Sequence, residues 1–116
     1  MTKDLNRLSA TEIMGYEVGE TNSSGGVWVR TAEKTHWQRE WWLFNPLTDL
    51  SQCFMVVEKM HELGWALRLI SMNDKMLYQS WFWHLDNEDS ADMFIDSNCC
   101  RAILAAALKA KGAGVQ

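Results

Sequence analysis

The sequence is short of proline, of paired cysteines and of long apolar runs, and each shortage excludes a class of protein. Its three cysteines show no C-x-x-C spacing, which argues against a disulfide framework and against a zinc ribbon. No run approaches the ~20 apolar residues of a membrane span, and the first residues lack the apolar core of a signal peptide. We therefore expect a protein of the reducing cytoplasm with no membrane contact.

Basic residues are also scarce, with 11 Lys and Arg against 15 Asp and Glu and a formal net charge of −4. This balance argues against a general binder of the DNA or RNA backbone, because such proteins are normally basic. What the chain does have is apolar residues, at 47% of 116, which suffices for one core and predicts a single domain over residues 1–116. Seven tryptophans exceed what one small core usually hides, so some should lie at a surface.

Residues 41–65 hold the clearest structural signals. The Asn45–Pro46 pair should end an extended aromatic segment, because the residue before a proline is pushed out of the helical region. Thr48 or Asp49 can then cap a helix that Gly64 ends. Two apolar stripes run along this helix, one of Leu50, Phe54, Val57 and His61 and the other of Cys53, Val56, Met60 and Leu63.

The flanking segments predict the remaining elements. A first helix is expected over residues 4–14, or a shorter one beginning at the Ser9–Glu12 capping box. The composition turns to Gly, Ser, Asn, Thr and Glu over residues 16–26, and residues 22–26 should form a loop or hairpin turn. Strands are expected over 27–30, 37–44, 65–70 and 76–84, and a last helix should begin after Ser97 or Asn98 and stop at Gly112. Two hairpins then form an antiparallel four-stranded sheet packed with helices, an α+β layered domain of order α-β-β-α-β-β-α.

Several short stretches resemble a family of small phage and prophage proteins, the phage ABA sandwich domain. The stretches are NPLTDL from Asn45, VVEK from Val56, Gly64 and CRAIL from Cys100, within a similarity that covers roughly residues 10–110. The resemblance implies a phage gene product in the cytoplasm of the host bacterium. It implies no reaction, because it carries over no catalytic residue.

Motifs for catalysis are weak. Cys53 lies on an apolar stripe and is expected to be buried, whereas Cys99 and Cys100 fall in the first turn of the last helix, where the helix dipole can lower a thiol pKa. The three histidines stand in no recognisable motif, and no Gly-rich phosphate loop is present. We expect structural cysteines, no cofactor, no metal and no enzymatic activity, with a cysteine-dependent enzyme as the remote alternative.

An acidic run precedes the last helix. In the structural interpretation its charges form a solvated loop that favours the N-terminus of that helix. In the functional interpretation they form a surface that imitates a nucleic-acid backbone or pairs with arginines of a host protein. The predicted partner-binding residues are Asp86, Glu88, Asp89, Asp92 and Asp96.

Aromatic residues are dense on two predicted strands. Alternation places Trp81 and Trp83 on one face and Phe82 on the other, and it separates Trp41 from Trp42. Core or subunit burial and an aromatic platform for a nucleotide ring are both open interpretations. The predicted interface or ligand residues are Trp37, Trp41, Trp42, Trp81 and Trp83.

These observations favour a binding protein. The leading hypothesis is a phage protein that binds and inhibits a host factor, such as an antiviral defence protein of the kind that anti-CRISPR proteins block. The alternative is a small-ligand binder that sequesters a nucleotide signal in an aromatic pocket. In either case the surplus of tryptophan predicts a homodimer or a higher closed assembly.

Overall fold

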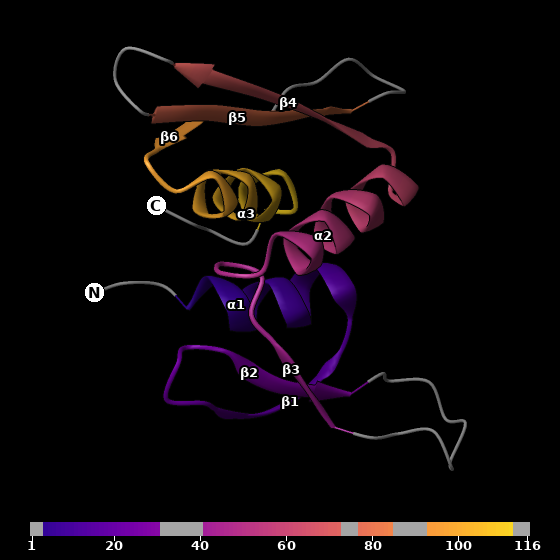
Figure 1. Ribbon diagram of the computed structural model, residues 1–116. Coiled ribbons are helices and arrows are strands. Elements are labelled where there is room, and N and C mark those ends of the chain that lie inside the picture. Colours follow the sequence, from indigo (N-terminus) through magenta and orange to yellow (C-terminus); the bar gives the residue numbers. More distant parts are fainter. Residues whose placement is uncertain (1–3, 31–40, 73–76, 85–92, 113–116) are drawn as a thin grey trace.

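Helices fill the middle of the molecule, and a three-stranded antiparallel sheet lies on either side of them (Figure 1). The structure is a computed structural model that describes residues 4–30, 41–72, 77–84 and 93–112. Its helical elements are α1 (Leu5–Leu8), the π-helix η1 (Ser9–Met14), α2 (Leu50–Glu62) and α3 (Cys99–Ala110). Its strands are β1 (Glu17–Thr21), β2 (Val27–Arg30), β3 (Trp42–Phe44), β4 (Trp65–Met72), β5 (Leu77–His84) and β6 (Phe94–Asp96).

The prediction of one four-stranded sheet is wrong, although the α+β class is confirmed. Strands β1, β2 and β3 form one sheet in that order, and β4, β5 and β6 form the other. The chain crosses from one sheet to the other through α2, which follows β3 and precedes β4. The two predicted hairpins therefore lie on opposite sides of the helices, and the layer order is sheet, helices, sheet (Figure 1).

The reason for this layering is the burial of α3. Cys100 and every residue of 102–108 are buried, so apolar side chains point in all directions around this helix. A helix that is hydrophobic all round must be covered on all sides and cannot form an outer layer. It packs against β5, β6, α2, η1 and α1, and the Ser80 hydroxyl on β5 donates a hydrogen bond to the Ala102 carbonyl.

Helix α2 begins and ends where the sequence predicts. The Asp49 side chain accepts a hydrogen bond from the Gln52 amide, and Gly64 follows the helix with a φ of 93°. Of the two apolar stripes, the structure buries Cys53, Val56 and Met60, whereas Leu50 and Phe54 are exposed. Both stripes have helical spacing, so their sequence could not show which one would meet α3.

Two strands were missed by the sequence prediction. Strand β1 lies in the Gly- and Glu-containing segment for which no strand was predicted, and it pairs with β2 across the predicted turn at residues 22–26. Strand β6 ends the acidic segment and pairs with β5 over only three residues. The first helix was predicted over the correct residues, but its second half is a π-helix that ends at Gly15 with a φ of 71°.

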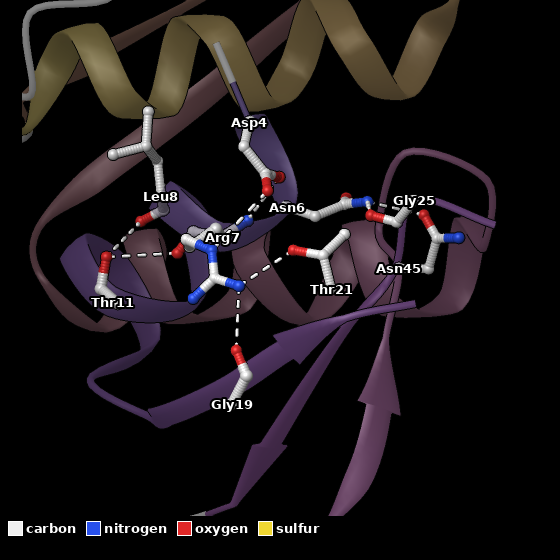
Figure 2. A network of polar contacts seen from close by, with 9 residues as sticks. All are labelled: Asp4, Asn6, Arg7, Leu8, Thr11, Gly19, Thr21, Gly25 and Asn45. Atoms are coloured by element: carbon white, nitrogen blue, oxygen red, sulfur yellow. Dashed lines mark hydrogen bonds and ion pairs between the residues drawn. The ribbon is translucent and has the colours of Figure 1, made fainter. Parts of the chain in front are cut away.

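A buried asparagine joins the first helix to the start of α2. Asn6 Nδ2 donates to the Gly25 carbonyl at 2.9 Å and to Asn45 Oδ1 at 2.8 Å, as Figure 2 shows. Asn6 Oδ1 accepts from the Leu47 amide at 3.1 Å. The carbonyl of Asn45 in turn accepts the amides of Thr48 and Asp49. The Asn45–Pro46 turn is therefore saturated by internal hydrogen bonds.

Arg7 fastens the same helix to the β1–β3 sheet. Its Nη2 donates to the Gly19 carbonyl and to Thr21 Oγ1, both at 2.9 Å, and the Asp4 carboxylate caps α1 by accepting from the Arg7 amide (Figure 2). Together, Asn6 and Arg7 hold α1 over the second half of β1 and the turn that follows it.

We predict opposite effects for two buried polar residues of this segment. Asn6→Ala leaves the Leu47 amide without its acceptor and should lower the free energy of unfolding by about 2–4 kcal/mol. Ser9 Oγ is buried and has no hydrogen-bond partner within the described ranges, so Ser9→Ala should be neutral or raise stability by about 1 kcal/mol. Urea denaturation of the two variants measures both values. An equal loss of stability in both would contradict the assigned role of Asn6.

Candidate functional site

The side of the β4–β6 sheet that faces away from the helices is rich in exposed apolar residues. The register pairs Ala66 with Trp83 and Arg68 with Trp81, and directly paired residues share a face. Phe82 and Ser80, which alternate with them, are fully buried on the helix side. We call this surface the β4–β6 outer face and define it by Arg68, Ile70, Trp81, Trp83 and Ile95.

Exposure distinguishes this face from a covered sheet surface. Ile95 is 50% exposed, Ile70 45% and Trp83 40%, while Trp81 is half-buried beside them. The Arg68 guanidinium lies 5.3 Å from the centre of the Trp83 ring, within cation–π distance. In the part of the chain that the structure describes, no carboxylate lies within ion-pair distance of Arg68. Tryptophan and arginine side by side on an apolar surface are typical of the energetic centre of a protein interface.

The outer side of the β1–β3 sheet also carries exposed tryptophan, with Trp41 at 44%, but there the arginine has an ion-pair partner. Arg30 lies 4.5 Å from the Trp41 ring centre and forms an ion pair of 3.0 Å with Glu17. The Trp41 indole crosses to Gly19, where an added Cβ would lie 3.2 Å from the ring. Trp28 is exposed on the same side. On this second surface Arg30 therefore forms an ion pair, and the Trp41 indole packs against Gly19.

The predicted interface tryptophans therefore occupy different surroundings. Trp81 and Trp83 lie on the β4–β6 outer face, and Trp41 lies on the opposite sheet. Trp42 points into the core, where its ring meets Tyr16 and Phe44 edge-on at 5.4 and 5.7 Å. Trp37 falls outside the described residues. The predicted separation of Trp41 from Trp42 and of Trp81 from Phe82 is confirmed.

Sequence reasoning missed three members of the β4–β6 outer face, namely Arg68, Ile70 and Ile95. Strand alternation over residues 65–70 predicts Arg68 and Ile70 on one face, and the register with β5 confirms it. Their exposure could not be derived, because it depends on which face the helices cover. Ile95 lies between half-buried Phe94 and Asp96, so the only signal was a three-residue alternation at the end of an acidic segment.

Of the predicted acidic surface, only Asp96 lies among the described residues; Asp86, Glu88, Asp89 and Asp92 lie outside them. Asp96 is half-buried on β6. Its Oδ1 accepts the Asn98 amide at 2.8 Å and lies 3.7 Å from Arg101 Nη1. Asp96 thus supports the start of α3, where the Asn98 side chain caps the helix by accepting from the Arg101 amide.

The three cysteines gather between the first turns of α2 and α3. Cys53 and Cys100 are buried and Cys99 is half-buried. Burial and the neighbouring Cys100 thiol raise the pKa of Cys53, and burial raises the pKa of Cys99. These surroundings favour the protonated thiols of Cys53 and Cys99, and a protonated thiol is a poor nucleophile. Across the described ranges, no three His, Cys, Asp or Glu side chains are placed to hold a metal ion.

A comparison with solved structures finds a protein of similar fold. The chain is similar to the crystal structure of a phage protein from Bacillus cereus ATCC 14579, with a TM-score of 0.65 and 21% identity over 94% of this chain and 92% of that chain. No family model and no curated protein matches the sequence. At this identity the likeness shows a shared fold. Among the described helices, none has the length and apolar character needed to cross a membrane.

We predict that the buried thiol of Cys53 makes stability depend on pH. Because its pKa is raised in the folded protein, the unfolded chain alone loses the thiol proton near pH 8.5. The Cys53 thiol should therefore make its complete contribution to the free energy of unfolding below about pH 8.5. Above that pH the free energy of unfolding should fall, by at most ~1.4 kcal/mol per pH unit from this group.

Urea denaturation between pH 7 and 10 tests this effect. Cys53→Ala should show a shallower fall than the wild type, and Cys99→Ala, whose thiol is less buried, should show a smaller change of slope. Parallel curves for Cys53→Ala and the wild type would contradict the assignment.

Proposed function

We propose that this chain is a phage protein that acts by binding a host protein, and that it inhibits that protein. The β4–β6 outer face is its contact surface in this proposal. The resemblance of residues such as Asn45–Leu50 to a phage family and the similarity of the fold to a Bacillus cereus phage protein support the phage origin. A host factor of antiviral defence is the target class that this origin favours.

The observation that carries the proposal is the exposed Trp83 with Arg68 above its ring. An indole and a guanidinium that lie in solvent gain most when a partner excludes water from both. Ile70 and Ile95 extend the apolar surface on either side of the central strand, β5. A fitting partner has an apolar surface with a carboxylate that can reach Arg68, because Arg68 has no ion pair among the described residues.

The raised thiol pKa values support binding rather than cysteine catalysis. A separate prediction is that the same partner also contacts an acidic surface, which is formed by Asp86, Glu88, Asp89 and Asp92. Their change to Asn or Gln tests the electrostatic part of the contact without altering the β4–β6 outer face.

The decisive variant is Trp83→Ala, and the chain offers a matched control in Trp28→Ala. The two indoles are 40% and 39% exposed, on the outer sides of different sheets. A host protein captured from lysate by the wild type would be purified, and its affinity for each variant measured by calorimetry. Trp83→Ala should weaken binding by about 30-fold or more, as expected for a central aromatic residue, and Trp28→Ala by less than about threefold.

Melting temperatures of both variants serve as the folding control. Equal affinities of Trp83→Ala and the wild type for the purified partner would refute the assignment of the β4–β6 outer face. A loss confined to Trp28→Ala would move the contact surface to the other sheet.

A further inference from the structure

Strand β4 has one edge without a strand partner among the described residues. All eight of its residues pair with β5 on one side, and β5 continues to β6, so β4 is the first strand of its sheet. It contains no proline, and the register with β5 is continuous from Trp65 to Met72 without a bulge. Natural edge strands are usually short, bulged, charged or interrupted by proline, because a long regular edge pairs readily with another strand.

The second half of β4 is also exposed on both of its faces. Ile70 on the outer side is 45% exposed, and Leu69, which points toward the helix layer, is 36% exposed. Helix α2 packs against β4, and α3 packs against β5 and β6, yet this cover leaves Leu69 partly exposed. A partner that completes β4 must therefore supply a strand together with apolar cover beneath that strand.

A second copy of this chain supplies both. We infer that two copies pair through β4 in antiparallel orientation, about a two-fold axis that is perpendicular to the sheet and passes through Leu69. Such an axis keeps the helix layer of both copies on the same side of the sheet, so helices continue beneath the strand pair. The β4–β6 sheets of the two copies then become one sheet of six strands.

The single charge of the described strand helps to select the register. With Leu69 on the axis, Arg68 of each copy lies opposite Ile70 of the other on the outer side, and the aliphatic part of the arginine can pack on the isoleucine. An axis through Arg68 would instead place the two guanidinium groups directly opposite each other, which is destabilising. Arg68 is already held over Trp83 in its own copy, which turns its charge away from the axis.

This assembly does not depend on the proposed host contact. It would join the β4–β6 outer faces of two copies into one surface with two Trp83 side chains. A dimer that binds no host protein would support the assembly and contradict the host contact. A monomer that binds a host protein would support the host contact and contradict the assembly.

Light scattering of the full chain at micromolar concentration gives the first test, with a mass about twice the 13.4 kDa of one chain as the expected result. Ile70→Lys places an ammonium opposite Arg68 of the second copy at two symmetric positions and should raise the dimer dissociation constant about tenfold or more. Ile70→Glu is equally polar but faces the same arginine with a carboxylate, and the dimer should persist.

The control is Ile95→Lys, which adds the same charge to the outer side at the far edge of the sheet and should leave the mass unchanged. A double variant, Arg68→Glu with Ile70→Lys, restores opposite charges across the axis and should recover the dimer. A wild-type mass of one chain overturns the inference. So does equal weakening by Ile70→Lys and Ile70→Glu, because that result excludes the register.

Discussion

Complete burial of α3 is the constraint on which the rest of the structure depends. Alanines at 102, 105, 106 and 107 let neighbouring elements approach closely, while Ile103, Leu104 and Leu108 fill the space between them. A helix of this kind needs cover on every side, and one sheet can cover only one. Helices α1, η1 and α2 supply the cover of α3 away from β5 and β6, and the β1–β3 sheet packs against η1 through β1.

The layering decides where this protein can meet other molecules. With α3 enclosed, the outer sides of the two sheets are broad surfaces of the molecule, beside the exposed face of α2 that carries Leu50 and Phe54 (Figure 1). The arginines of the two sheets differ, since Arg30 forms an ion pair with Glu17, whereas Arg68 lies over the Trp83 indole and forms no ion pair with another described residue. The charge of the arginine on the β1–β3 surface is thus already paired within the chain. The β4–β6 surface, with its long open strand, retains the apolar and charged groups that a partner would cover.

Local signals made much of the chain predictable. The Asp49 cap, the stop at Gly64 and the start of α3 after Asn98 depend on neighbouring residues and were found from sequence. Division of the strands into two sheets depends on how the helices pack between them, and residues 17–21 form a strand that pairs with β2 and accepts a hydrogen bond from Arg7. The exposed face was predicted only in part. Strand alternation placed Trp81 and Trp83 on the same face, but it could not show which face the helices would cover.

In the inferred dimer, β4 is the edge at which a second copy extends the β4–β6 sheet. Residue-resolved amide hydrogen exchange tests it directly, because alternate amides of an antiparallel edge strand point away from its neighbour. We expect every amide from Ala66 to Ser71 to be protected, with the protection of the outward amides rising with protein concentration. Rapid exchange of those alternate amides at all concentrations, beside protected ones that bond to β5, would contradict the account.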